Sequence, residues 1–165
     1  MVHTLVTVDL NGKSLYLSTL KAIDADMTSS ASTTNRNNNK SILAVDDENT
    51  IVDIIKQSLQ RQEFKVCTFT DPFEALAHFN SASKEDYHHI VLSDIRMPGM
   101  NGYEFIRKVK ECDPKVKVML MSAFEINDKE FHNILPDIKV DAFLQKPFSI
   151  QQLNNIVEKI SADSP

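Results

Sequence analysis

Polar side chains follow four apolar runs in this chain, each at the point where the run ends. They are Asp46 and Asp47 after the first run, Asp94 at the end of the second, Ser122 after the third and Lys146 after the fourth. Short apolar runs bounded by turn residues are typical of buried strands. Because the carboxyl ends of parallel strands meet at one edge of a sheet, we expect these five side chains to converge there.

This combination of residue types suits phosphate chemistry. Carboxylates that lie close together repel one another, and a divalent cation removes the conflict. Oxygen ligands of this kind suit Mg²⁺, which also binds phosphate oxygens, and Mn²⁺ is the expected substitute. Lys146 adds an ammonium group and Ser122 a hydroxyl donor. Phosphoryl transfer needs such positioning and charge neutralisation, and Asp94 is the candidate nucleophile, which would form an aspartyl phosphate.

The chain alternates between strand and helix patterns from Ser41 onwards. Strands are predicted at residues 42–45, 65–69, 90–94, 116–121 and 140–144. Residues that are apolar except for Ser58 recur at helical spacing after the first, third and last of these strands. They are Ile51, Ile54, Ile55, Ser58 and Leu59, then Phe105, Ile106 and Val109, and finally Ile150, Leu153, Ile156, Val157 and Ile160, which we expect the final helix to bury. Helix-start signals occur at Asp71-Pro72 with Glu74, at Asn127 with Glu130 (a helix that stops before Pro136), and at Ser149 with Gln152.

This alternation predicts an α/β fold with helices on both faces of a parallel sheet. The strands at 65–69 and 140–144 are mixed in polarity and suit the edges of the sheet. We therefore expect a flavodoxin-like, doubly wound, five-stranded sheet in the order 2-1-3-4-5. No Gly-x-Gly-x-x-Gly follows the first strand, which excludes a dinucleotide-binding domain.

Residues 1–40 differ in composition and hydrophobic pattern from the rest of the chain. Val6, Val8 and Leu10 alternate with polar residues before Asn11-Gly12, which predicts a hairpin. Residues 28–39 are mostly Ser, Thr and Asn with almost nothing to bury, as in a flexible linker. The extension is either a docking or dimerising appendage or a weakly ordered addition, with Met27 as an alternative start. We expect one domain at 41–162 and a short tail at 163–165.

The net charge and the composition argue against several classes of protein. The net charge of −5 argues against direct nucleic-acid binding, which needs a basic face. We interpret the basic group Arg107, Lys108, Lys110, Lys115 and Lys117 as a solvated helix face and strand flank. No apolar segment approaches the length of a membrane span, and no secretory signal is evident, so we expect a cytoplasmic protein.

The cysteine and histidine residues do not indicate a disulfide or a metal site from the sequence. Cys67 and Cys112 are too few and too isolated to indicate a disulfide framework or a zinc site, so we expect both to be reduced. His88 and His89 are adjacent residues entering a strand and should point to opposite faces, which favours a surface position over a metal site. His78 has no evident partner. Met97, Met100, Met119 and Met121 are expected to pack in loops and core.

Four segments together resemble the receiver domain of two-component response regulators. They are Leu-Ala-Val-Asp-Asp-Glu, Val-Leu-Ser-Asp-Ile-Arg-Met-Pro-Gly-Met-Asn-Gly, Met-Ser-Ala and Asp-Ala-Phe-Leu-Gln-Lys-Pro-Phe, and the resemblance covers residues 41–162. It implies that a histidine kinase or phosphotransfer protein donates a phosphoryl group to Asp94.

The resemblance also implies roles for individual residues. Asp47 and Asp94 would bind Mg²⁺ with help from Asp46, and the backbone carbonyl of Arg96 would be a further ligand. The phosphoryl oxygens would be bound by Ser122 and Lys146, whose bond to Pro147 is cis in the family.

The same resemblance implies a conformational switch and bears on the lifetime of the phosphorylated form. Ser122 would move towards the phosphoryl group, and Phe143 would turn inward into the vacated space, altering the surface formed by 127–135, 140–144 and 149–160. Arg96 and Phe124 flank the acceptor, and neither orients water as an acid or amide would. We therefore expect slow self-dephosphorylation.

The leading hypothesis is a phosphorylatable signalling receiver that assists only its own phosphorylation and dephosphorylation, and is not an enzyme acting on an external substrate. One alternative is a receiver-like interaction module that is never phosphorylated. Another is a Mg²⁺-dependent aspartyl-phosphate phosphohydrolase, although the expected Asp-x-Asp after the first strand is Asp-Asp-Glu here. Only five residues follow Ile160, so we expect the protein to act alone on an unknown downstream protein target or to relay phosphate. A homodimer through the last strand and last two helices is left open.

Overall fold

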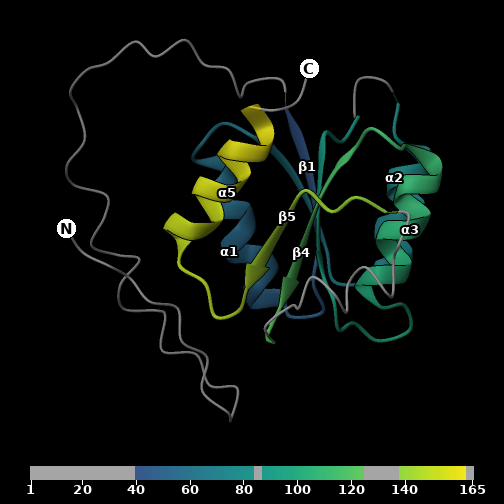
Figure 1. Cartoon of the computed structure of the whole chain (residues 1–165), viewed down its shortest axis with the longest axis horizontal. Coiled ribbons are helices and arrows are strands. Elements are labelled where there is room, and N and C mark those ends of the chain that lie inside the picture. The colour runs from purple at the N-terminus through teal and green to yellow at the C-terminus, as the bar shows by residue number, and fades with distance from the viewer. Residues whose placement is uncertain (1–39, 84–86, 125–137, 163–165) are drawn as a thin grey trace.

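A computed structural model describes residues 40–83, 87–124 and 138–162 (Figure 1). The elements along the chain are β1 (Ser41–Val45), α1 (Asn49–Gln60), β2 (Lys65–Phe69), α2 (Pro72–Ser81), β3 (Ile90–Asp94), α3 (Gly102–Cys112), β4 (Lys117–Ser122), β5 (Ala142–Gln145) and α5 (Ile150–Ala162). All strand pairings are parallel, and the order across the sheet is β2-β1-β3-β4-β5. The predicted doubly wound α/β architecture is confirmed.

Each face of the sheet builds its own apolar core. Ile42, Ala44 and Leu92 belong to the core that α1 and α5 complete. Leu43 and Val91 point the other way, into the core beneath α2 and α3, because successive side chains of a strand alternate between faces. Figure 1 shows the two helix pairs on opposite sides of the strands. Burial on both faces explains the continuous apolar runs at Ile42–Val45 in β1 and Ile90–Leu92 in β3.

Local sequence signals fix where the helices begin. Asp71 caps α2 by accepting hydrogen bonds from the backbone N–H groups of Phe73 and Glu74. Ser149 and Gln152 form the predicted capping box, with the Gln152 N–H donating to Ser149 Oγ at 3.1 Å and the Ser149 N–H donating to Gln152 Oε1 at 2.8 Å. The longest described helix, α5, has 13 residues. Within the described ranges, no helix has the length and apolar character needed to cross a membrane.

The last strand differs from its predicted bounds of 140–144. It runs from Ala142 to Gln145, because Asp141 interrupts the ladder with its side chain. Asp141 Oδ2 accepts the Val118 N–H at 3.0 Å, while the Asp141 N–H donates to the Val118 carbonyl at 2.9 Å. Lys117 Nζ lies 3.3 Å from the same carboxylate. A charged clamp therefore replaces the first rung between β4 and β5.

Two predictions about burial need correction. His88, expected at the surface, is only 2% exposed, since the end of α2 packs its rings over the start of β3. Ile150 and Ile156 of α5 are half-buried rather than buried. The four methionines expected in loops and core are all buried, as predicted.

Two further predictions fall on parts of the chain that are not described. The hairpin and linker of the N-terminal extension lie within 1–39, and the helix predicted from Asn127 lies within 125–137. Both lie outside the described residues. The predicted basic surface is described, and three of its lysines have partners within the chain. Lys108 pairs with Glu104 at 3.7 Å, Lys110 Nζ donates to the Val116 carbonyl at 2.6 Å, and Lys117 pairs with Asp141 at 3.3 Å.

Candidate functional site

Asp94 ends β3, and a glycine lets the next helix approach it closely. The Gly102 N–H, at the start of α3, donates to the Ile95 carbonyl at 2.9 Å. A Cβ atom at Gly102 would lie 2.1 Å from the Asp94 carbonyl oxygen and 2.9 Å from Ile95 Cα. Those neighbours are backbone and cannot swing aside, so this position requires glycine. The helix thereby fixes the loop between Asp94 and Asn101.

Lys146 joins the two buried carboxylates of the site. Its Nζ lies 2.6 Å from Asp46 Oδ2 and 2.6 Å from Asp94 Oδ1, with Glu48 Oε1 further away at 3.9 Å. The Lys146 N–H donates to the Ser122 carbonyl at 2.6 Å, which ties the end of β5 to the end of β4. The Lys146–Pro147 bond is cis, as the resemblance implied. Residues from β1, β3 and β5 therefore meet at the carboxyl end of the sheet.

The second oxygen of each buried carboxylate is also occupied. Asp94 Oδ2 accepts the Arg96 N–H at 2.6 Å, and Asp46 Oδ1 accepts the Glu48 N–H at 3.1 Å. Asp46 is fully buried and Asp94 is 5% exposed. Each carboxylate is thus compensated by one ammonium contact and one backbone donor, which offsets part of its desolvation.

Burial and charge shift the protonation of this pair. Burial raises the pKa of Asp46 to about 6, against the lowering effect of the Lys146 ammonium; the nearby Asp94 charge adds to the rise. Burial alone would lower the pKa of Lys146, but the charges of Asp46 and Asp94 and their hydrogen bonds outweigh it and raise that pKa. Lys146 therefore stays protonated at neutral pH, whereas Asp46 takes up a proton more readily than an ordinary aspartate.

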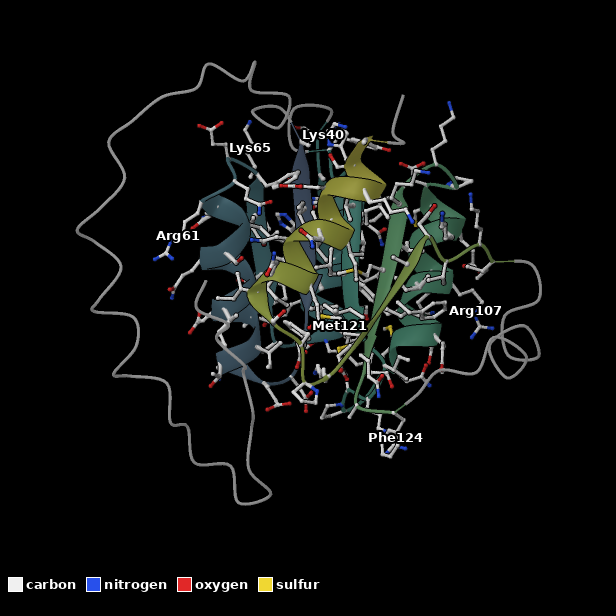
Figure 2. The ribbon with its side chains drawn as sticks, turned by 60° about the vertical axis from the view of Figure 1, so that its left-hand side comes forward. Lys40, Arg61, Lys65, Arg107, Met121 and Phe124 are labelled. Carbon is white, nitrogen blue, oxygen red and sulfur yellow. The ribbon has the colours of Figure 1, made fainter. Side chains whose placement is uncertain are left out.

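Ser122 and two flanking side chains border the acceptor. Ser122, the last residue of β4, is 7% exposed, and its Oγ accepts the Phe124 N–H at 3.0 Å. The Arg96 guanidinium lies 4.2 Å above the centre of the Phe124 ring, a cation–π contact between the two predicted flanks. Figure 2 shows Phe124 at the opposite end of the sheet from Lys40 and Lys65.

Phe143 lies near Ser122 on the same side of the sheet. It pairs with Leu120, two residues before Ser122, and packs partly buried against the core beneath α2 and α3. Alternation along β4 turns Leu120 and Ser122 towards the same face. The aromatic ring and the hydroxyl predicted to act together are therefore neighbours on one face.

An open hollow of about 300 Å³ lies over these groups, with room for a phosphoryl group and a hydrated ion. Its lining consists of Asp47, Glu48, Asp94, Ile95, Arg96, Ser122, Ala123 and Lys146. Asp47 is exposed at this rim, and Asp46 is buried beneath it.

The charges around the hollow suit a divalent cation. Lys146 contacts Asp46 and Asp94, and Asp47, Glu48 and Arg96 also line the hollow, so four carboxylates face two cationic side chains and carboxylate charge is in excess. An oxygen-rich, negatively charged site of this kind fits Mg²⁺ or Mn²⁺.

The structure brings together Asp46, Asp94, Ser122 and Lys146, and it places Asp47 and Arg96 at the rim. Sequence reasoning missed two contributors. Glu48 borders the hollow beside Lys146, and Gly102 holds α3 against the acceptor. The signal for Gly102 was present, since a glycine directly after the Asn101 cap is a poor helix former unless space demands it.

Comparison with known proteins identifies the family. The family model described as "Response regulator receiver domain" matches residues 42–158. The alkaline phosphatase synthesis transcriptional regulatory protein PhoP of Bacillus subtilis is 32% identical over 123 residues, covering 74% of this chain and 48% of that protein. The response regulator receiver protein CpdR of Brucella abortus is 30% identical over 122 residues, covering 73% of this chain and 96% of that protein.

Solved structures show the same fold. The chemotaxis response regulator CheY4 of Vibrio cholerae has a TM-score of 0.64 at 25% identity, covering 73% of this chain and 98% of that one. The response regulator TrrA of Thermotoga maritima, solved in complex with Mg²⁺-BeF, has a TM-score of 0.62 at 28% identity with the same coverage. The chain spans about half or less of the length of several curated relatives. On these matches and this fold, the chain belongs to the response regulator receiver domain family, a family of signalling domains.

Proposed function

We propose that this protein is a phosphorylatable receiver that accepts a phosphoryl group from a phosphohistidine onto Asp94. The observation that carries the proposal is the position of Lys146 Nζ, 2.6 Å from both Asp46 and Asp94 beside an open hollow. An ammonium there neutralises charge on the transferring group while it holds the acceptor in place.

The transfer is an exchange of one bond to phosphorus for another. An Asp94 carboxylate oxygen attacks phosphorus, the P–N bond to the donor imidazole breaks, and the imidazole leaves with the bond's electron pair and takes up a proton. The product is an acyl phosphate on Asp94. Lys146 Nζ and the Ser122 hydroxyl then bind phosphoryl oxygens, and Arg96 and Phe124 restrict water.

Mg²⁺ would be held by Asp47, Asp94 and the backbone carbonyl of Arg96, and Asp46, which is buried beneath the hollow, would assist directly or through water. When bound, the ion neutralises negative charge on the carboxylates and the incoming phosphoryl group. The excess of carboxylates over cationic side chains at the hollow supports this ligand set. The solved complex of TrrA with Mg²⁺-BeF supports the same chemistry by analogy.

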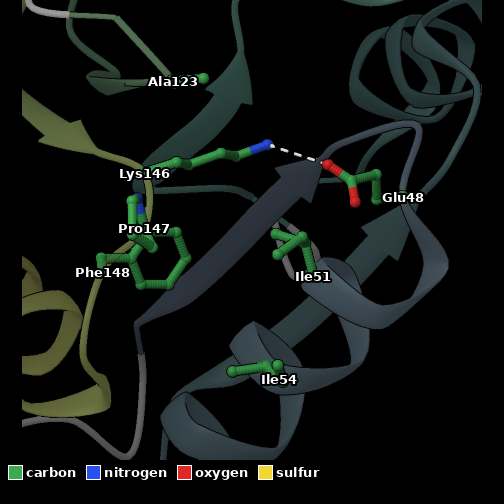
Figure 3. A pocket seen from close by; sticks show the side chains of 7 residues that line it. All are labelled: Glu48, Ile51, Ile54, Ala123, Lys146, Pro147 and Phe148. Carbon is green, nitrogen blue, oxygen red and sulfur yellow. Dashed lines mark ion pairs between the residues drawn. The ribbon is translucent and has the colours of Figure 1, made fainter. Parts of the chain in front are cut away.

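The donor protein docks, in this proposal, over a second hollow that adjoins the first. Figure 3 shows Ile51, Ile54, Pro147 and Phe148 along this hollow, with the ion pair of Lys146 and Glu48 at its border. Glu48, Ala123 and Lys146 line both hollows. An apolar surface that leads directly to the acceptor suits a helix carrying the phosphohistidine.

The output surface, in this proposal, lies along β5 and α5. A third hollow there is lined by Phe143, Ile156, Lys159 and the Lys117–Asp141 pair, among others. Inward rotation of Phe143 after phosphorylation would change this hollow, and a partner protein would read the change. A second copy of the chain bound there is the alternative outcome, which sedimentation of the phosphorylated protein distinguishes.

We further propose that the protein acts as a single-domain regulator in the cytoplasm. The match to CpdR supports the single-domain part of this proposal, since it covers 96% of that protein. Such a regulator controls its target by docking or passes its phosphoryl group to another protein.

The central test is phosphorylation of the purified chain by a small phosphoryl donor with Mg²⁺, followed by mass spectrometry. We expect addition of one phosphoryl group, lost in Asp94→Asn and lost when Mg²⁺ is chelated, with Mn²⁺ restoring it. No addition from small donors or from a histidine kinase would overturn the proposal in favour of an unphosphorylated interaction module.

Docking is tested separately from chemistry. Ile54→Glu places a charge in the half-buried wall of the second hollow, away from the acceptor. It should slow transfer from a histidine kinase at least tenfold and leave phosphorylation by a small donor unchanged. Equal effects on both donors would contradict docking at this surface.

Lifetime is tested at the aromatic flank. Phe124→Glu removes the ring under Arg96 and supplies a group able to orient water, so the phosphorylated form should decay several-fold faster. Phe124→Leu is the matched control and should change decay less. An unchanged decay rate in Phe124→Glu would show that this flank does not limit water.

A further inference from the structure

A cluster of one thiol and two imidazoles lies outside the phosphorylation site. It is formed by Cys67 of β2, His78 near the end of α2 and His88 just before β3. Their ligand atoms all lie within 4.8 Å of one another. His88 is 2% exposed, and the other two residues are half-buried. The cluster is set back from the carboxyl edge, beneath α2, on the side of the sheet that Figure 1 shows covered by α2 and α3.

The ring of His88 is held in a fixed orientation. Its Nδ1 lies 3.0 Å from Ser41 Oγ, and its ring stacks on Phe79 at 6.2 Å between centroids with an angle of 21°. When Nδ1–H donates to Ser41 Oγ, Nε2 carries the lone pair that a metal requires. An outer hydrogen bond that fixes the tautomer in this way is a regular feature of metal-binding histidines.

His78 completes the site from the helix. Its ring lies 5.1 Å from the His88 ring and 5.0 Å from the Phe69 ring, centroid to centroid. Its Nε2 is buried and has no hydrogen-bond partner within the described part of the chain. A buried imidazole nitrogen without a partner is costly unless something binds it. Phe69 and Phe79 supply the apolar surroundings that limit access of water.

We propose that Cys67, His78 and His88 bind a zinc ion. Ligand atoms around one tetrahedral zinc lie about 3.3–3.6 Å apart, given bonds of about 2.0–2.3 Å, so small side-chain rotations close the observed spacing. Thiolate and imidazole are ligands that zinc prefers, whereas Mg²⁺ requires oxygen. Binding releases one proton from the Cys67 thiol, both imidazoles bind as neutral bases, and water takes the fourth position.

The consequence of this site is a clamp on α2. The helix fully buries only Pro72 and Ala75, and its Leu76 and Phe79 pack partly buried against the core. A zinc ion would tie its last turn to β2 and to the entry of β3. This proposal is independent of phosphorylation, because none of its ligands lies among the residues of the acceptor site.

The test uses untagged, metal-free protein with Mg²⁺ in excess, so that oxygen sites are occupied. Co²⁺ serves as the spectroscopic probe for zinc. We expect one equivalent of Co²⁺ to give a thiolate-to-metal charge-transfer band that Zn²⁺ abolishes. Cys67→Ser should lose the band, and His78→Gln should weaken binding at least tenfold. The matched control Cys112→Ser should keep the band, since Cys112 is exposed and outside the cluster.

A second readout follows the thiol itself. The chain has two cysteines, so Cys112→Ser leaves Cys67 as the only reactive thiol. One equivalent of Zn²⁺ should slow its alkylation at least tenfold in folded protein, and Asp94→Asn should not change this protection. The proposal is overturned if no charge-transfer band forms, if the band survives in Cys67→Ser, or if Zn²⁺ leaves the alkylation rate unchanged.

Discussion

The two ends of the sheet hold their polar groups by different means. At the carboxyl end, Lys146 Nζ lies 2.6 Å from both Asp46 and Asp94, so formal charges bind across three strands. At the amino end, Ser41 Oγ lies 3.0 Å from His88 Nδ1, and the imidazole stacks among other rings.

The difference concerns how each end responds to a ligand. The charges of Asp46, Asp94 and Lys146 are held in a balance that an incoming ion or phosphoryl group can change. The contacts around His88 are neutral and serve packing and the proposed zinc site, although the Lys117–Asp141 pair also lies at the amino end, where β4 and β5 begin. Removing groups from either end should therefore give distinct results.

The largest expected effect is at the carboxyl end. Lys146→Met leaves two buried carboxylates without their ammonium partner, which should lower the free energy of unfolding by about 3 kcal/mol. Phosphorylation by a small donor should slow by about 10²-fold, as expected for loss of a charge-stabilising donor. Urea unfolding and mass spectrometry measure the two quantities.

Lys108→Met is the matched control, because Lys108 forms an exposed pair with Glu104. Its effect on stability should stay below about 0.5 kcal/mol, with no effect on phosphorylation. Similar losses in the two variants would remove the distinction between buried and exposed pairs.

Gly102→Ala tests the close contact of α3 with the acceptor. The added Cβ would meet the Asp94 carbonyl oxygen, so we expect a loss of about 1–3 kcal/mol in unfolding free energy and slower phosphorylation. Gly99→Ala is the comparison: its φ of +78° costs about 1 kcal/mol, but its contact is the exposed, movable ring of Phe73. If Gly99→Ala slows phosphorylation as much, the contact at Gly102 is not specific.

The dependence of stability on pH should also distinguish the two ends of the sheet. The pKa of Asp46 rises from 3.8 to about 6 on folding, so the folded state binds its proton more tightly. Without Mg²⁺, stability from this group is therefore greatest below about pH 4 and falls as the pH rises to about 6. Asp46→Asn should remove this slope and be more stable than the natural chain at neutral pH by about 1–3 kcal/mol. Denaturant midpoints across this range in chelator measure it, and an unchanged slope would contradict the assignment.

The smallest effect should come from the amino end. Ser41→Ala removes the hydroxyl beside His88 and should cost about 1 kcal/mol in unfolding free energy, with phosphorylation unchanged. Ser81→Ala, at an exposed hydroxyl, should cost less than about 0.5 kcal/mol. Slower phosphorylation in Ser41→Ala would show that the two ends are coupled.

The carboxyl end was predictable because unusual residue types follow apolar runs. A buried strand that ends in Asp94, or is followed by Asp46, carries the signal within a few residues. The parallel topology then brings these residues together. The mixed polarity of two strands predicted the edges of the sheet, which suits the order 2-1-3-4-5 that the structure shows. Sequence could not show that Lys146 contacts Asp46 as closely as Asp94, since that depends on side-chain positions across the sheet.

The amino end was not predictable in the same way. The Cys67, His78 and His88 cluster joins a strand, a helix and a loop at spacings that match no motif. Its assembly depends on where the end of α2 lies over β3, which local patterns do not specify. For the same reason His88 was predicted at the surface, although it is buried. The predicted start of β5 was wrong for a different reason: the Asp141 carboxylate accepts the Val118 N–H and so competes with the backbone hydrogen bonds between β4 and β5.

The clamp at the start of β5 limits how a signal can travel. Asp141 fixes that strand at one end through Val118 and Lys117, and the Lys146 N–H fixes the other end through the Ser122 carbonyl. Contacts at both ends of the strand oppose sliding past its neighbour, so the switch proposed for Phe143 would be a turn of its ring between the two anchors. Phosphorylation would then change the shape and polarity of the surface around Phe143, while the backbone of β5 keeps its position.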